Sequence, residues 1–584
     1  MRNAAYAASR VPGMFIKNIR KGCWRLKLEK KGRLWVVLML VLALLAGCTG
    51  GGGSSSGGGG GTGSSSGAGS SSGGGGGGSG NAAPPGNEPI TLKFVRAHWV
   101  DVSPSNNEKW IWKKYEEMTN IHVEWEEIPV GNFQERFNIL MNTGDYGDAF
   151  YGANTVIGVE QMAEYARQGI FIPLDDLIEK HAPNIREMLN KRPEIRQALT
   201  MPDGKIYSLP YVQESAADAS LRYYINKKWL DNLGLGLPKT LDEFTDMLRA
   251  FRDRDANGNG DPNDEVPYYM NIIGFLEQQL YGSFGLGTGG LQSINQWVYK
   301  DENGQIQPMW TSEGQRAVWR YLNLLWKEGL LHPQIFESIE YGQWVADAAA
   351  GKVGVFSFVT PDYIGSAAAD YVGIHVLEGP QGHKIMSWID NPARSISAFA
   401  ITNKNPHPER TIQWVDFWYG ESGQIMGMFG VEGETFVRDE KGMPVYTDDI
   451  LNYKDGWQLG AFQKLDHVYG GFYPIWEPDS SLKLNAIGKT PEEYFAAPDI
   501  GQIDRYLPPE LWPSFSPTEE ESKELAALRA DIGPYVDEAR VKFAKGEWNI
   551  DGADWDNYVQ TMKRIGYDRW VEIKREQYKR IIGG

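Results

Sequence analysis

Residues 90–125 read ITLKFVRAHWVDVSPSNNEKWIWKKYEEMTNIHVEW, and this stretch decides the fold class. Residues 90–95 alternate apolar and polar side chains, as a half-buried strand does. Residues 107–118 place apolar side chains at helical spacing, and residues 121–125 alternate again. A strand, a helix and a second strand in this order predict a parallel sheet, because the helix returns the chain to the start of the next strand.

The same alternation of elements continues along the chain. A second helix is expected over 133–141, followed by a short strand over 148–151. Near the C-terminus, Thr490 and Ser516 are each followed by proline and, three residues on, by glutamate, which predicts two capped helix starts. The fold class is therefore expected to be α/β with a helix-rich C-terminal part.

The N-terminus has the form of a secretory signal. Residues 34–46 are a 13-residue apolar run preceded by lysines and arginines, too short for an ordinary membrane span. Residues 45–48 read Leu-Ala-Gly-Cys, which resembles the cleavage site of lipoprotein signal peptides. We expect residues 1–47 to be removed and Cys48 to carry diacylglycerol and palmitate, anchoring the protein at the outer face of the cell membrane. The alternatives are an uncleaved anchor helix and a start codon downstream, at Met14.

Residues 48–89 are expected to form a tether. Residues 49–80 are almost entirely glycine and serine, a composition that cannot form a core and behaves as a flexible coil. Such a coil spans about 30 Å. Prolines at 84, 85 and 89 then stiffen the approach to the folded region.

Charge and cysteine content argue against a nucleic-acid binder and against a disulfide-stabilised fold. The chain has 584 residues and a formal charge of −17, which becomes −26 without residues 1–47, so a nucleic-acid binder is not expected. Its only cysteines are Cys23 and Cys48, so no disulfide framework is available to the folded region.

A collinear series of motifs resembles the family 1 extracellular solute-binding proteins, particularly the large lipoproteins of Gram-positive bacteria. The motifs lie at 169–185, 202–210, 224–230, 240–244 and 555–558. The resemblance implies a two-lobed periplasmic-binding-protein-like fold of type II, with a hinge between discontinuous lobes. On this basis we expect one lobe at 90–211 and 355–403, and the other at 212–354 and 404–584.

The resemblance also implies a function. Such a protein captures a solute between its lobes by hinge closure and delivers it to the permease subunits of an ABC importer. A carbohydrate, in particular an oligosaccharide, is the expected ligand, and the protein is expected to act as a monomer. A binding protein for another solute, or one that serves sensing, has the same sequence features.

The stretch 255–265, DANGNGDPNDE, has the composition of a calcium loop. Oxygen-bearing side chains stand at alternate positions, and Gly260 falls sixth, where an EF-hand loop turns sharply. The expected ligands are Asp255, Asn257, Asn259, Asp261, Asp264 and Glu265. A register that starts at Asp253 fits the spacing as well, and the resemblance favours Asp255. A turn without metal is the alternative. We expect a structural role for calcium.

Sugar binding needs aromatic rings for the C–H faces of the ligand and polar groups for its hydroxyls. The chain has 21 tryptophans and 28 tyrosines, and four segments place such residues side by side. The candidate ligand-binding residues are Trp99, Asp101, Gln213, Glu214, Trp388, Asp390, Tyr473 and Trp476. The alternative for each aromatic residue is a place in the core. Trp99 and Asp101 follow the first strand, where ligands bind in open α/β sheets.

Motifs for catalysis are absent from the sequence. Outside the tether there is no Gly-x-Ser-x-Gly elbow, and the eight histidines form no His-Glu-x-x-His pair. Adjacent acids such as those at 126–127 and 175–176 are typical of solvated faces. A carbohydrate-active enzyme is therefore the less favoured alternative.

The acidic surface favours a neutral ligand, whereas local basic residues such as Arg96 or Arg222 would favour a charged one. Arg96 on the first strand is itself expected to face solvent or to be ion-paired.

Overall fold

A computed structural model describes residues 88–98, 104–152, 157–214, 220–337, 339–454, 456–467 and 473–581. The expected signal peptide, Cys48 and nearly all of the tether lie outside these residues. The candidate ligand residues Trp99 and Asp101 lie outside them too.

Six strands form the first sheet, in the order β14-β4-β11-β3-β1-β2. They are β1 (Ile90–His98), β2 (Ile121–Pro129), β3 (Ala149–Tyr151), β4 (Leu209–Val212), β11 (Ala393–Ile401) and β14 (Ile475–Trp476). β1 is parallel to β2 and β3, and β4 is parallel to β14. β11 runs antiparallel between β3 and β4. The β-α-β unit predicted at 90–125 is confirmed.

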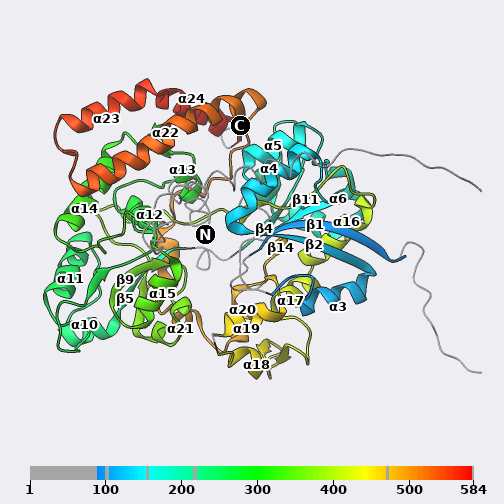
Figure 1. Cartoon of the computed structure of the whole chain (residues 1–584), viewed down its shortest axis with the longest axis horizontal. Coiled ribbons are helices and arrows are strands. Elements are labelled where there is room, and N and C mark those ends of the chain that lie inside the picture. The colour runs from blue at the N-terminus through cyan, green and yellow to red at the C-terminus, as the bar shows by residue number, and fades with distance from the viewer. Residues whose placement is uncertain are drawn as a thin grey trace, which may run out of the picture. The chain divides into compact units, whose positions relative to one another are not determined.

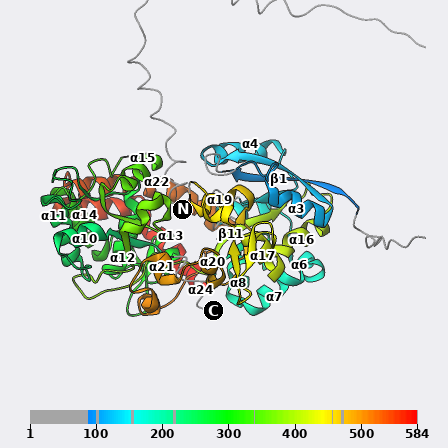
Figure 2. The ribbon, with the colours of Figure 1, turned by 90° about the horizontal axis from the view of Figure 1, so that it is seen from below.

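Side-chain alternation along β1 assigns the two faces of this sheet to different helices. Leu92 and Phe94 belong to one core, and Val95 and Ala97 to another. The first core packs against α3 (Trp110–Thr119), α6 (Asp175–His181), α7 (Pro183–Lys191), α8 (Pro193–Leu199), α16 (Pro408–Asp416), α17 (Glu421–Phe429) and α19 (Trp457–Lys464). The second packs against α4 (Phe133–Thr143) and α5 (Val159–Arg167). Figure 2 shows α4 on one side of β1 and α6, α7 and α8 on the other.

Four strands form the second sheet, in the order β10-β5-β9-β6. They are β5 (Arg222–Asn226), β6 (Val266–Tyr268), β9 (Val353–Phe358) and β10 (Tyr371–Ile374). The helices of its core are α10 (Lys227–Leu233), α11 (Leu241–Asp253), α12 (Ile273–Ser283), α13 (Gly290–Asn295), α14 (Glu313–Lys327), α15 (Tyr341–Ala349), α22 (Glu519–Lys545), α23 (Ala553–Arg564) and α24 (Tyr567–Ile581). In Figure 1 these elements gather on one side of the view, and those of the first sheet gather on the other.

The expected lobe boundaries differ from this division in two places. Residues 355–403 were assigned to the first lobe, yet this range contains residues 355–358 of β9 and the whole of β10, which belong to the second sheet, and only β11 joins the first. Residues 404–584 were assigned to the second lobe, yet α16, α17 and β14 pack in the core of the first sheet. The sequence does not reveal where the chain crosses, because strands of both sheets are equally apolar.

The capped helix starts are half confirmed. Helix α21 (Pro491–Phe495) begins after Thr490, whose hydroxyl and backbone N–H both bond to Glu493. The start predicted at Ser516 is wrong. Helix α22 begins after Thr518, which makes the same reciprocal bonds with Glu521, two residues further along. No helix within the described part of the chain is long and apolar enough to cross a membrane.

Candidate ligand-binding site

The carboxyl ends of the parallel strands lie at one edge of the first sheet, where β11 begins, and we call this the carboxyl edge. Ligands of open α/β sheets bind beyond such an edge. Among the candidate ligand residues, Gln213 and Glu214 follow β4, and Trp476 ends β14. The structure therefore brings together two segments that are more than 260 residues apart.

Gln213 is held at the carboxyl edge by two hydrogen bonds. Its backbone N–H donates to Pro392 O at 2.9 Å, and its side-chain oxygen accepts from Arg394 Nη1 at 2.7 Å. Arg394 makes no ion pair with a carboxylate of the described residues, so its guanidinium has only the amide of Gln213 as a side-chain partner there. The sequence contains no local signal for Arg394, which is 181 residues from Gln213.

Trp476 and Glu214 form the second pair at this edge. The indole N–H of Trp476 donates to Glu214 Oε1 at 2.8 Å, and the other carboxylate oxygen pairs with Arg192. Lys191 Nζ lies 6.0 Å from the centroid of the Trp476 ring. The indole is therefore fixed at its polar end, while its ring is only half-buried and can offer a face to a ligand.

Glu477, the residue after Trp476, is a buried carboxylate that the candidate set did not include. It accepts a hydrogen bond from Tyr211 Oη at 2.6 Å and one from Lys483 Nζ at 2.5 Å. Its side chain is only 3% exposed, so it contributes to the packing behind the carboxyl edge and is not open to a ligand. These contacts lock β4 to β14 at the point where Gln213 and Trp476 project.

Tyr473 belongs to a buried ionic network and not to this edge cluster. Its hydroxyl accepts from Arg96 Nη2 at 3.3 Å, and Arg96 pairs with Asp466 at 3.0 Å. Lys109 Nζ also binds Asp466, at 2.7 Å. Asp466 thus faces two cations, and all three charged side chains are essentially inaccessible to solvent. Arg96 is therefore ion-paired and unavailable to a charged ligand.

Burial and the neighbouring charges shift the pKa values of Asp466, Lys109 and the adjacent His467. Burial alone would raise the pKa of Asp466, but the positive charges of Arg96 and Lys109 hold it well below its usual range. Burial lowers the pKa of Lys109 to about 8, against the attraction of Asp466. Burial lowers the pKa of the neighbouring His467 to about 3, so this imidazole is neutral at physiological pH.

Trp388 and Asp390 lie in the segment between β10 and β11. Trp388 is 5% exposed and packs in the core of the second sheet, with its ring edge toward Phe275 at 6.5 Å between centroids. Asp390 Oδ1 accepts from Gln292 Nε2 at 2.9 Å and from the N–H of Asn391. These two candidates are therefore attached to the second sheet, whereas Gln213, Glu214 and Trp476 belong to the first.

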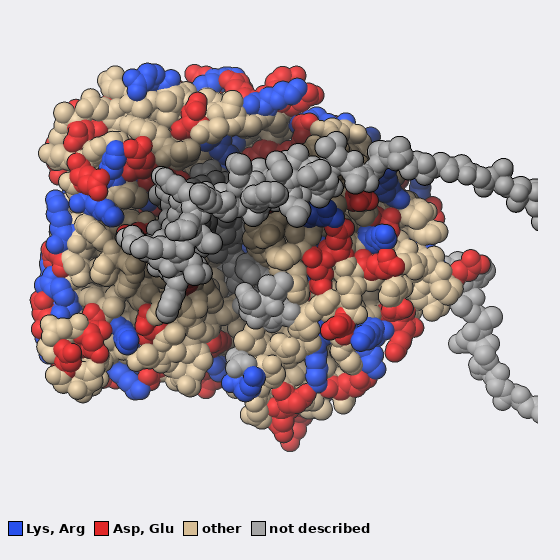
Figure 3. All heavy atoms as spheres, in the orientation of Figure 1, with Lys and Arg blue, Asp and Glu red and all other residues tan. Residues whose placement is uncertain are grey.

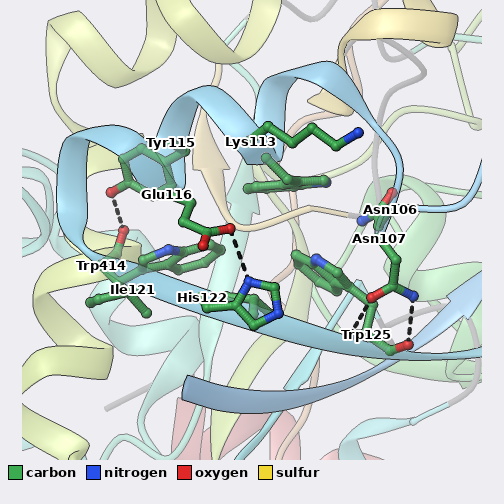
Figure 4. A pocket seen from close by; sticks show the side chains of 11 residues that line it. Asn106, Asn107, Lys113, Tyr115, Glu116, Ile121, His122, Trp125 and Trp414 are labelled. Atoms are coloured by element: carbon green, nitrogen blue, oxygen red, sulfur yellow. Dashed lines mark hydrogen bonds and ion pairs between the residues drawn. The ribbon is translucent and has the colours of Figure 1, made fainter. Parts of the chain in front are cut away.

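A small pocket opens between α3 and β2. Figure 4 shows Trp125 and Trp414 beneath α3, with Glu116 and His122 joined by a hydrogen bond of 2.9 Å. The cavity volume is about 30 Å³, the share of liquid volume that one water molecule occupies. Ligand sites for small molecules have volumes of about 300–1,000 Å³. This pocket is therefore too small for a sugar ring.

The loop that follows α11 folds around its own acidic groups. Asp255 accepts hydrogen bonds from the N–H groups of Asn259 and Gly260, at 3.0 and 2.9 Å. Asp264 accepts from the side-chain amides of Asn257 and Asn259, at 2.9 and 2.8 Å. Four of the six expected metal ligands thus converge, although no group of three His, Cys, Asp or Glu side chains in the described ranges could hold a metal.

Two further residues complete the picture of this loop. Glu265 Oε1 accepts from the N–H of Ala256 at 2.9 Å, while Glu265 Oε2 is buried and has no partner among the described residues. Asp261 Oδ1 accepts from the backbone N–H and the side-chain amide of Asn263, at 3.1 and 2.9 Å. Asp253 is the last residue of α11 and binds Arg252. The donor set of carboxylate and amide oxygens suits calcium.

Comparison with known proteins defines the class to which the chain belongs. Residues 104–425 match the family model described as bacterial extracellular solute-binding protein. The match covers more than half of the chain, so the chain belongs to this family, and the expected resemblance is confirmed. Members and relatives of this family are binding proteins.

Individual relatives bind oligosaccharides or polysaccharides. The chain is 27% identical over 519 residues to the fructooligosaccharide ABC transporter substrate-binding protein FusA of Streptococcus pneumoniae serotype 4, covering 85% of this chain and 91% of FusA. The polygalacturonan/rhamnogalacturonan-binding protein YtcQ of Bacillus subtilis is 23% identical over 386 residues, covering 61% and 70%. The structure of FusA in complex with kestose has a TM-score of 0.70, with 25% identity and coverage of 84% and 99%. An EF-hand mutant of FusA in complex with fructo-nystose has a TM-score of 0.69, with the same identity and coverage. The two-lobed fold is thereby confirmed.

Proposed function

We propose that this protein is the substrate-binding component of an ABC importer and that it captures an oligosaccharide. The observation that supports this most directly is the carboxyl edge, where Trp476, Glu214, Gln213 and Arg394 place an aromatic ring beside hydrogen-bonding groups. The similarity of the whole chain to FusA agrees with this proposal. Lysines and arginines intermingle with acidic side chains on the face in Figure 3, which suits a small solute better than a nucleic acid.

A thermal-shift screen of the purified protein against neutral and acidic oligosaccharides tests this function. A ligand at a hundredfold excess over its Kd stabilises the folded state by about 2.7 kcal/mol through mass action. We expect at least one oligosaccharide to raise the Tm and to be recovered uncleaved. A flat panel would refute sugar binding, and recovery of cleaved sugar would show a hydrolase instead.

The variant Trp476→Ala tests the site itself. Removing the ring is expected to weaken oligosaccharide binding by up to about tenfold, since an aromatic contact contributes about 0.5–1.5 kcal/mol. Trp326→Ala is the matched control, because Trp326 is also half-buried but packs against Phe336 in the core of the second sheet. Equal affinity of the Trp476 variant and the unaltered protein would show that the ligand does not contact this ring.

We further propose that the loop 255–265 binds calcium in a structural role. The unpartnered Glu265 Oε2 and the converging side chains of Asp255 and Asp264 support this, and the EF-hand of FusA agrees with it. Calcium would bind oxygens of Asp255, Asn257, Asn259, Asp264 and Glu265, and would offset their mutual repulsion. EDTA is expected to lower the Tm of the unaltered protein and to leave that of Glu265→Gln nearly unchanged. Equal melting with and without EDTA, together with calcium-free protein, would refute the proposal.

The N-terminus supports export and anchoring. We propose that residues 1–47 are cleaved and that Cys48 is lipidated, so that the tether holds the binding domain beside its permease at the outer face of the membrane. Labelled palmitate is expected to enter the unaltered protein and not the Cys48→Ser variant. If the variant is labelled and retained at the membrane to the same extent, another anchor is present.

A further inference from the structure

Several buried polar atoms in α12 and in segments that adjoin it have no hydrogen-bond partner among the residues that the structure describes. They are Asn271 Oδ1, Gln278 Oε1, Gln279 Oε1 and Nε2, Asp362 Oδ2 and Trp388 Nε1. Gln278, Gln279 and Trp388 are 8%, 6% and 5% exposed, so water does not reach them freely. Most buried polar groups in proteins have a partner, and leaving one unpaired destabilises the fold. A concentration of unpaired groups in one place therefore needs an explanation.

Ring contacts, one hydrogen bond and their position along the chain connect these residues to α12, and we call them the α12 cluster. Phe275 in the first turns of α12 contacts Trp388 and Phe358, with ring centroids 6.5 and 5.9 Å apart. Gln279 follows Phe275 by four residues and so lies on the same face of the helix. Ser387, beside Trp388, donates to Gln278 O at 2.6 Å. The segment after β9 reaches the same place, since Phe358 also contacts Tyr363, the residue after Asp362.

The chemistry of the α12 cluster is specific. Four of its six unpaired atoms are hydrogen-bond acceptors, and the two donors are an amide and an indole N–H. A ligand rich in hydroxyl groups can donate to all four acceptors and also accept from both donors. A carboxylate can only accept, and it would face the oxygens of Asn271, Gln278 and Asp362 without a hydrogen atom between them.

We infer that the α12 cluster is the second-sheet half of the ligand site and that it selects a neutral oligosaccharide over a uronate. This inference rests on the proposed function and names the ligand class of that site. Hydroxyls of the sugar satisfy the unpaired acceptors when the protein binds it. Arg394 at the carboxyl edge then donates to ring or hydroxyl oxygens of the sugar. Its hydrogen bond to the amide oxygen of Gln213 is an example of such donation to a neutral acceptor.

Shape-matched apolar variants test the placement. Gln279→Met removes two unpaired polar atoms and keeps the side-chain length, so the Tm without ligand is expected to stay equal or rise. Affinity for the sugar is expected to fall about tenfold, the effect of one lost hydrogen bond of ordinary strength. The matched control is Gln577→Met, because Gln577 is fully buried but bonded to Lys574 and Glu521. That control is expected to lower the Tm and to leave affinity unchanged.

The ligand class is tested by calorimetric titration with fructo-oligosaccharides, malto-oligosaccharides, galacturono-oligosaccharides and alginate oligosaccharides of equal length. Binding of a neutral series that Gln279→Met weakens supports the inference. Binding of a uronate series that Arg394→Gln abolishes overturns it and leaves the proposed oligosaccharide function intact. Neutral binding that Gln278→Met and Gln279→Met both leave unchanged also overturns it. Absence of binding to every saccharide refutes the proposed function and the inference with it.

Discussion

His467 makes the stability of the first core depend on pH, and the variant His467→Gln is expected to remove that dependence. The imidazole is 1% exposed and surrounded by aromatic rings in tilted and edge-on contacts, with Trp418 at 4.6 Å between centroids. Its Nε2 lies 3.0 Å from Tyr151 Oη, and its Nδ1 is buried and has no partner in the part of the chain that the structure describes. Protonation would place a charge in this apolar cage beside Lys109 and Arg96, although Asp466 attracts it.

The expected magnitude follows from the two pKa values. Burial lowers the pKa of His467 to about 3 in the folded state, whereas an unfolded histidine titrates near 6.5. Between these values the unfolded chain binds more protons, so the free energy of unfolding falls as the pH falls below 6.5. From pH 7 to pH 5 the loss amounts to about 2 kcal/mol. This figure depends on the unfolded pKa alone, because the folded group stays neutral throughout that range.

Urea unfolding at pH 7, 6 and 5, followed by tryptophan fluorescence, measures this difference. The unaltered protein is expected to lose about 2 kcal/mol more over this range than His467→Gln, whose side chain does not titrate. Any change in packing caused by the substitution acts equally at each pH and cancels in the comparison. If both proteins lose the same stability, His467 titrates normally and the argument from burial is wrong.

Two further pairs of variants test the packing of the two cores. Asp466→Asn leaves two buried cations without an anion and is expected to lower the free energy of unfolding in urea by about 3–5 kcal/mol. Lys109→Met leaves the remaining cation paired with Asp466 and is expected to lower it little. Similar losses of stability in both variants would contradict this. Gly282→Ala would place its Cβ 1.7 Å from Ile385 O and is expected to cost about 1–3 kcal/mol or more. Gly274→Ala on the same helix meets only an ordinary contact and is expected to raise the Tm slightly, so a loss at Gly274 would show that the clash is not the cause.

Local sequence patterns predicted the first elements well. The strand expected at 90–95 is β1, the helix expected at 107–118 is α3, and the helix expected at 133–141 is α4. Each is decided by side chains within a few residues of one another, so a short window contains the information. The start of α22 was placed two residues early because Ser516 and Thr518 both offer a hydroxyl with glutamate three residues on.

The partners of the site residues could not be predicted in this way. Whether a tryptophan belongs to the core or binds a ligand depends on which residues cover its ring. Trp388 and Trp476 look alike in this respect in the sequence. The structure buries the ring of Trp388 against Phe275, so that only its indole N–H is offered to the α12 cluster, and it leaves the ring of Trp476 half-buried at the carboxyl edge. Arg96 and Asp466 are 370 residues apart, and the sequence around either residue does not predict the other as its partner.

The order of strands explains why the partners of the ligand-site residues in particular could not be predicted from local sequence. β4 lies between β11 and β14, so both of its neighbours come from far later in the chain. Between β4 and β11 the chain builds the whole second sheet, and it reaches β14 only after α19. Gln213 and Glu214 therefore acquire Arg394 and Trp476 as partners only when two long crossovers have closed. A site assembled by such crossovers has its information in the pairing of distant strands, which periodicity within a single strand does not contain.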